Sequence, residues 1–230
     1  KGKIEIHRCS VDSSSMTLKK WTETEITLGE IALVKLKFGL EETYHENPPL
    51  LQVDFANMYL GVRLSRLFYS LFLTHTCISN QGGVLSGGSV QEEIRFSISP
   101  ELIVAMLFSP AMLDSEAIHI IGSEQFSSYK GYSYGLRYGG DFKDPTPRDT
   151  DGSVRTAVTA IDALDGRRMG RHFPSQWKMK NILRELNKAY AGFVPESTET
   201  LKCFQELGTG NWVRIFVLLR FSKHTHTHTR

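Results

Sequence analysis

The stretch that decides the fold is GGVLSGGSVQEEIRF, which runs from Gly82 to Phe96. Its glycines predict a loop that can approach a ligand closely, because glycine lacks a Cβ atom. Ser89 is the expected N-cap of a following helix, which puts Gln91 to Glu93 in its first turn. Free N–H groups at such a helix start can hold an anion, so a phosphate-bearing ligand fits here. The alternative is a glycine-rich turn before a helix that begins with acidic residues.

A short buried strand is expected ahead of this stretch. Residues 50–57, LLQVDFAN, are mostly apolar and end in polar side chains. In open α/β sheets, ligands bind at the carboxyl ends of the strands. Asp54 and Asn57 are therefore candidate site residues.

The remaining elements are predicted from periodicity and turn residues. The expected strands cover residues 3–7, 31–38, 117–122 and 154–163, and the expected helices cover 101–108 and 175–190. Residues 122–132 are expected to form a polar loop, and 141–152 a linker-like loop. Strands and helices that alternate in this way are typical of an α/β sheet with helices on its faces.

Several segments resemble, in the same order, the catalytic core of poly(ADP-ribose) glycohydrolase. The resemblance runs from Gly39 to Trp212 and implies a macrodomain-like mixed sheet with helices on both faces, incomplete in this chain. The matching segments are Val53-Asp54-Phe55-Ala56-Asn57, the glycine loop, Gln91–Phe96, Ser99–Ile103, Gly122–Tyr132, Ala160–Leu164, Arg184–Tyr190 and Thr209–Trp212.

The chain departs from that family at the glycine loop, where the family has three consecutive glycines followed by six to eight residues and Gln-Glu-Glu. Here only Gly82 and Gly83 are contiguous. Joining Gly61 to Gly82 restores three glycines and leaves seven residues before Gln91. We therefore expect residues 62–81 to be an insertion, namely a translated intron.

Both ends of the interruption fit that origin. The segment opens with Val-Arg, whose codons can form a splice donor, and ends at Gln81, whose codon can form an acceptor. Another Val-Arg pair follows Trp212, and residues 224–229 repeat His-Thr as a translated CA repeat does. We therefore expect a partial catalytic domain over 1–212 and an aberrant tail over 213–230. A metal-binding histidine tract is the alternative for that tail.

The resemblance also implies roles for particular side chains. Glu93 is expected to be the general acid that protonates the leaving ribose oxygen and later activates water. Glu92 is expected to hold ribose hydroxyls, and Asp54 to fix the pocket. Successive helical residues lie about 100° apart, so the two glutamates cannot act on one atom. The implied contacts to adenine, sugar and diphosphate are Leu40, Glu41, Asn57, Gly61, Gly82, Gly83, Gln91, Tyr132 and Asn211.

The residues alone leave some of these roles open. Leu40 and Glu41 fit a solvated turn as well as an adenine contact. Tyr132 lies in a stretch rich in tyrosine and glycine, where a ring can stack on a base or cover the edge of a core. His119 lies in an apolar run, and we expect a core histidine there rather than a catalyst.

Composition limits the classes of protein that fit. The chain has 230 residues, of which 40% are hydrophobic and 23% charged, as expected for one domain or part of one. A net charge of +2 means that affinity for a polyanion must come from a local site. No Gly-Lys-Ser/Thr follows the glycines, which excludes a P-loop. The chain has three cysteines, Cys9, Cys77 and Cys203. Their odd number favours a reducing compartment, and their spacing is not that of a metal site.

The resemblance thus implies a glycoside hydrolase that cleaves ribose–ribose bonds of poly(ADP-ribose) and releases ADP-ribose, without cofactor or metal. Its expected partners are poly(ADP-ribose) and poly(ADP-ribosyl)ated proteins, with no direct nucleic acid or membrane contact. We expect a monomer that acts in nucleus and cytoplasm in the DNA damage response. Because residues 62–81 interrupt the anion loop, we expect little activity from the chain as written. The alternatives are a non-catalytic ADP-ribose-binding macrodomain and a misfolded fragment of a wrongly assembled gene.

Overall fold

The structure is a computed structural model. It describes residues 2–12, 14, 16–23, 51–61, 84, 89–164 and 178–193. The sequence-based predictions that lie outside the described residues are the strand 31–38, the insertion 62–81, the tail 213–230 and the site residues Leu40, Glu41, Gly82, Gly83 and Asn211.

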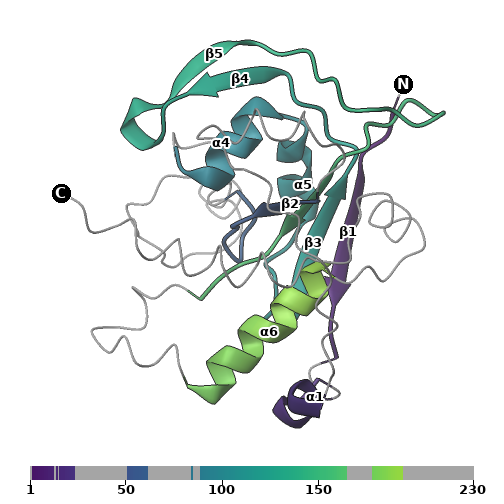
Figure 1. The fold of residues 1–230 in the computed structure, drawn as a ribbon, viewed down its shortest axis with the longest axis vertical. Coiled ribbons are helices and arrows are strands. Elements are labelled where there is room, and N and C mark those ends of the chain that lie inside the picture. Colours follow the sequence, from purple (N-terminus) through teal and green to yellow (C-terminus); the bar gives the residue numbers. More distant parts are fainter. Residues whose placement is uncertain are drawn as a thin grey trace, which may run out of the picture.

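Within the described residues, a mixed four-stranded sheet forms the centre of the fold (Figure 1). In spatial order its strands are β1 (Glu5–Ser10), β3 (Glu116–Ile121), β6 (Ala157–Ala160) and β2 (Leu51–Asp54). β3 is antiparallel to both β1 and β6, whereas β2 is parallel to β6. Asp54 pairs with Ala160, so the carboxyl ends of β2 and β6 lie side by side.

Helices cover both faces of this sheet, which confirms the predicted α/β arrangement. On one face lie α4 (Gln91–Ile98) and α5 (Leu102–Phe108), and on the other lies α6 (Met179–Phe193). A short helix that periodicity did not predict, α1 (Leu18–Glu23), contacts α6 where Trp21 packs edge-on against Tyr190.

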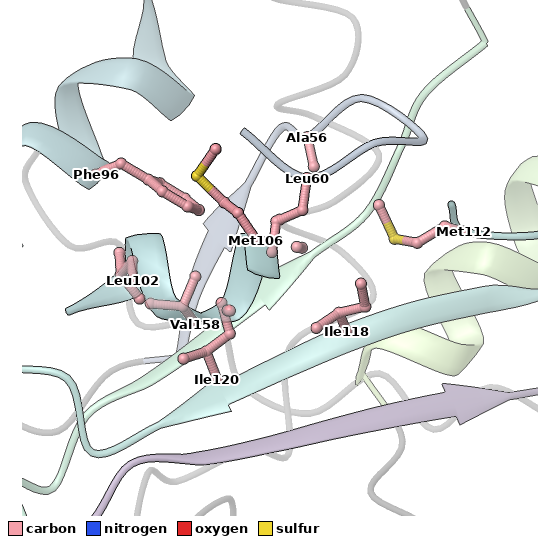
Figure 2. Close-up of a cluster of buried hydrophobic side chains, with 11 residues drawn as sticks. Ala56, Leu60, Phe96, Leu102, Met106, Met112, Ile118, Ile120 and Val158 are labelled. Atoms are coloured by element: carbon pink, nitrogen blue, oxygen red, sulfur yellow. The ribbon is translucent and has the colours of Figure 1, made fainter. Parts of the chain in front are cut away.

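The alternation of side chains along β3 explains why two separate cores form. Ile118 and Ile120 point into the core beneath α4 and α5, whereas Ala117 and Ile121 point toward α6. Figure 2 shows the first of these cores, in which Phe96 of α4 is fully buried. The other side chains labelled in that cluster are Ala56, Leu60, Leu102, Met106, Met112, Ile118, Ile120 and Val158.

A two-stranded antiparallel hairpin lies over α4 (Figure 1). It consists of β4 (Ser127–Lys130), the 3₁₀ turn η2 (Ser133–Gly135) and β5 (Arg137–Asp141). Two backbone hydrogen bonds hold it near the helix. Phe126 N–H, directly before β4, donates to the carbonyl of Ile98 at the end of α4 (2.9 Å), and Ser133 N–H in the turn donates to the carbonyl of Ser89, two residues before α4 begins (2.9 Å). The prediction of a loop over 122–132 is therefore wrong, because β4 becomes a strand only through pairing with β5.

The predicted start of α4 is wrong by one residue. Val90, not Ser89, is the N-cap, and the backbone carbonyl of Ser89 is occupied by the hairpin. The Glu93 carboxylate reaches back to the Val90 N–H at 3.2 Å, which supplies half of a capping box. The other bounds also shift slightly, since β1 ends at Ser10, β6 spans only Ala157–Ala160 and α6 ends at Phe193.

His119 of β3 is fully buried and hydrogen-bonded, which confirms it as a core histidine. Its Nε2 donates to the Gly192 carbonyl at 3.0 Å, so Nδ1 is left to accept from the Cys9 thiol at 3.2 Å. Burial lowers the pKa of His119 from 6.5 to about 4, because the imidazolium would lose its hydration. The ring therefore joins α6 to the sheet in its neutral form.

We expect the free energy of unfolding to fall as the pH drops from 6.5 toward 4. In that interval the unfolded chain's imidazole takes up a proton while His119 in the folded state stays neutral, so folding loses up to about 3 kcal/mol by pH 4. Above pH 6.5 both states are neutral and this contribution to the pH dependence vanishes.

Urea unfolding of the wild type and His119→Gln between pH 4 and 7 measures this effect. The difference between the two curves isolates His119, since carboxylates titrate in both proteins. A difference that does not change with pH would contradict the assignment.

Candidate active site

The Gln91 side chain fixes the start of α4 to the edge of β2 that faces away from β6. Phe55 N–H donates to Gln91 Oε1 at 2.9 Å, and Gln91 Nε2 donates to the Val53 carbonyl at 2.8 Å. The Asp54 carbonyl instead faces β6, where it accepts from Ile161 N–H at 3.1 Å. The amide of Gln91 thus bonds to the edge of β2 that faces away from β6, as a neighbouring strand would.

The Glu92 carboxylate fixes the loop that follows β2. Its Oε1 accepts from the backbone N–H of Gly61 at 2.5 Å, and the side chain is 4% exposed. Such a charge-assisted bond is stronger than a neutral one. Glu92 therefore positions the first glycine of the predicted anion loop, whatever else it contacts when a ligand is bound.

Gly61 occupies a position where any other residue would be strained and would force the Met106 side chain to move. Its φ of +71° lies in the left-handed region, and a Cβ atom there would come within 2.5 Å of both Sδ and Cε of Met106 in α5. Met106 was not predicted as a neighbour of the site, because it is far from Gly61 in the sequence and no local pattern indicates that α5 packs against this loop.

Gly61 and Val84 are far apart in the sequence but adjacent in the structure. The Val84 N–H donates to the Gly61 carbonyl at 3.1 Å. If residues 62–81 were absent, Gly61-Gly82-Gly83-Val84 would be consecutive, and this bond would be the i to i+3 hydrogen bond that closes a β-turn. Glycine at both central positions suits any turn type. The geometry therefore fits the predicted insertion, which itself lies outside the described residues.

Glu93 lies in the first turn of α4 and is 6% exposed. Its Oε2 accepts from Val90 N–H, whereas its Oε1 makes no hydrogen bond to the part of the chain that the structure describes. One oxygen is thus held in place while the other is available to a ligand.

Asp54 and Asn57 follow one another at the carboxyl end of β2. Asp54 is fully buried, and because Val53 packs toward α6, the Asp54 side chain points to the α4 face of the sheet. Asn57 is half-buried and its Oδ1 accepts from Tyr59 N–H at 3.4 Å. Both residues therefore lie at the end of the strand to which α4 is fixed.

Tyr132 reaches the site from the hairpin. Burial raises the pKa of the Tyr132 phenol, as does the negative charge of Glu93, while a hydrogen bond from the Gln91 backbone opposes the shift. The next residue, Ser133, has a φ of +54° and bonds to Ser89. A strained turn thus holds the tyrosine against the first turn of α4, and this contact was not predicted.

The structure brings together the predicted site residues that it describes. One end of β2, the loop after it, the start of α4 and the hairpin supply Asp54, Asn57, Gly61, Gln91, Glu92, Glu93 and Tyr132. Among the described residues, no group of three His, Cys, Asp or Glu side chains could hold a metal ion. Nor is any described helix long and apolar enough to cross a membrane.

Comparison with known proteins agrees with this geometry. Residues 76–213 match the family described as poly(ADP-ribose) glycohydrolase with a macro domain fold. The chain belongs to the poly(ADP-ribose) glycohydrolase family. The macrodomain-like fold expected from the resemblance is thereby confirmed.

Two relatives of this family show how much of it the chain represents. It is 43% identical over 174 residues to poly(ADP-ribose) glycohydrolase 1 of Arabidopsis thaliana, a match that covers 76% of this chain and 26% of the plant protein. It is 35% identical over 186 residues to poly(ADP-ribose) glycohydrolase 2 of Caenorhabditis elegans, covering 77% of this chain and 33% of the worm protein. The chain thus spans a third or less of the length of these relatives.

Replacing Gln91 by alanine should destabilise the protein by about 1–3 kcal/mol, because two backbone groups of β2 lose their partner. Chemical denaturation measures the change. Ser97→Ala, on the exposed side of the same helix, is the matched control and should cost much less. If the variant instead keeps its stability but no longer binds ligand, Gln91 contacts the sugar and does not stabilise the fold.

Deleting residues 62–81 should leave a folded protein with an equal or higher melting temperature. Gly61 and Val84 already meet, and a shorter connection costs less chain entropy on folding. Circular dichroism and thermal melting of the chain with and without the segment provide the measurement. Loss of cooperative melting in the deletion variant would contradict the prediction that Gly61, Gly82, Gly83 and Val84 form a β-turn when they are joined.

Proposed function

We propose that this chain carries the catalytic site of a poly(ADP-ribose) glycohydrolase, which hydrolyses the ribose–ribose O-glycosidic bonds of poly(ADP-ribose) and releases ADP-ribose. The observation that supports this most directly is the position of Glu93. It is a buried carboxyl group with one oxygen held by Val90 N–H, in a helix turn fixed to the carboxyl end of β2. The family membership of the chain supports the same reaction.

In this proposal Glu93 acts first as an acid and then as a base. In its protonated form it gives a proton to the glycosidic oxygen of the leaving ribose while the bond to the anomeric carbon breaks. Positive charge develops on the sugar in an oxocarbenium-like transition state. A water molecule then attacks the anomeric carbon and returns a proton to Glu93. Atoms and charge balance without a cofactor.

The neighbouring side chains have supporting roles. Glu92 holds the Gly61 N–H, and we propose that it also contacts ribose hydroxyls. Asp54 fixes the end of β2 beside the sugar, and Asn57 is available to a hydroxyl. Because Glu92 accepts from the Gly61 N–H, we propose that the backbone N–H groups of Gly82 and Gly83 bind the diphosphate. Tyr132 shields the sugar from water, since its phenol lies near Glu93.

The setting of this activity is part of the proposal. The substrate is poly(ADP-ribose) attached to proteins, in nucleus and cytoplasm, within the DNA damage response. The protein acts as a monomer and has no direct contact with nucleic acid or membrane. Residues 62–81 separate Gly61 from Gly82 and Gly83 in the sequence, so the chain without them is expected to be the more active form.

Glu93→Gln should lower the rate of ADP-ribose release by about 10²–10⁴, because glutamine keeps the shape of the side chain but has no acidic proton to transfer to the leaving oxygen. The rate is measured by chromatography after incubation with a poly(ADP-ribosyl)ated protein, for the chain with and without residues 62–81. Binding of ADP-ribose, measured by calorimetry, should persist in the variant.

Glu23→Gln is the matched control, since Glu23 is an exposed carboxylate at the end of α1 and should leave the rate unchanged. If the folded 62–81 deletion variant binds ADP-ribose but releases none from the polymer, the proposal is overturned in favour of a non-catalytic reader. Absence of cooperative melting in both forms would overturn it in favour of a misfolded fragment.

A further inference from the structure

The turn of the β4–β5 hairpin carries positive charge that the described structure does not neutralise. We call residues 130–137, KGYSYGLR, the hairpin tip. It contains two cations, Lys130 and Arg137, and no acidic residue. Both side chains are exposed, and neither forms an ion pair with any residue that the structure describes.

The two cations of the hairpin tip lie directly opposite each other. Lys130 pairs with Arg137 in the register of β4 and β5. Like charges at opposed positions of an antiparallel pair destabilise it, and a two-stranded ribbon has little stability to spare. An anion bound at this position would remove the repulsion, so the arrangement favours an anionic ligand over an empty surface.

Aromatic rings flank these cations. Tyr134, in the 3₁₀ turn, is completely exposed, and Tyr132 is 58% exposed. Neighbouring tyrosine rings and cations are the combination by which proteins hold bases and phosphates of extended nucleotide chains, by stacking and by charge. A nucleoside diphosphate unit provides both a base and two phosphates.

The hairpin tip is continuous with the candidate active site. Ser133 N–H bonds to the Ser89 carbonyl directly before α4, and Tyr132 lies near Glu93. A polymer whose terminal bond is beside Glu93 therefore has its next unit within reach of residues on the same turn. The tip extends the site along the substrate rather than forming a separate surface.

We propose that the hairpin tip binds the ADP-ribose unit adjacent to the one being released, with Lys130 and Arg137 on its diphosphate and Tyr134 stacked on its adenine. This inference rests on the proposed function for its ligand. With this second contact, the protein binds polymers of several units more tightly than it binds single ADP-ribose.

The test measures binding of ADP-ribose and of size-fractionated poly(ADP-ribose) to Glu93→Gln protein, which prevents turnover. Tyr134→Ala should weaken polymer binding by about 5- to 150-fold, the range for loss of one stacked base. The double variant Lys130→Gln, Arg137→Gln should reduce the slope of log K against log salt by about 1.4, as expected for two phosphate contacts. Affinity for single ADP-ribose should not change in either variant.

Two controls separate charge from folding. Lys178→Gln with Lys180→Gln removes the same charge from the start of α6, on the other face of the sheet, and should leave polymer binding intact. Lys130→Glu puts a carboxylate opposite Arg137, so it should preserve or raise the melting temperature while polymer affinity falls.

The outcomes distinguish this inference from the proposed function. Polymer affinity that is unchanged in the tip variants overturns the inference, even if the wild type releases ADP-ribose through Glu93. A folded 62–81 deletion variant that binds polymer through the tip but releases no ADP-ribose supports the inference and overturns the hydrolase proposal. A fall in polymer and ADP-ribose affinity by the same factor also overturns the inference, since the tip would then contact the terminal unit.

Discussion

The amide of Gln91 is the connection on which the candidate active site depends. It bonds to Phe55 and Val53 on the edge of β2 that faces away from β6, so the first turn of α4 is held like one more strand of the sheet. Because the helix begins at that point, the two residues that follow Gln91 are fixed in direction as well. Glu92 turns toward Gly61 and Glu93 folds back onto Val90.

Burial of two carboxylates in successive positions needs compensation, since an unpaired charge in a protein interior is costly. Here each carboxylate accepts from a backbone N–H, and both lie at the positive end of a helix. The same hydrogen bonds also shape the site. The stability of this region and its ability to bind a ligand therefore depend on the same hydrogen bonds.

The sequence predicted the α/β class, the strand ending at Asp54 and the helix that begins with Gln91, because apolar runs and polar strand ends are local signals. It also identified His119 as a core residue. The hairpin was missed, since Ser127–Lys130 becomes a strand only by pairing with a tyrosine- and glycine-rich segment that has no periodicity of its own. The contacts of Met106 with Gly61 and of Ser133 with Ser89 could not be predicted from local sequence patterns either, because each contact joins segments that are far apart in the chain. The residue roles that came from family resemblance, rather than from local pattern, stay predictions.

One hydrogen bond has a practical consequence for protein engineering. Gly61 and Val84 are far apart in the sequence but lie side by side, joined by a backbone hydrogen bond. A junction of this kind accepts a foreign folded module whose own two termini are close, without pulling the host apart. A fluorescent reporter grafted there would sit beside the glycine loop and could sense when that loop is occupied.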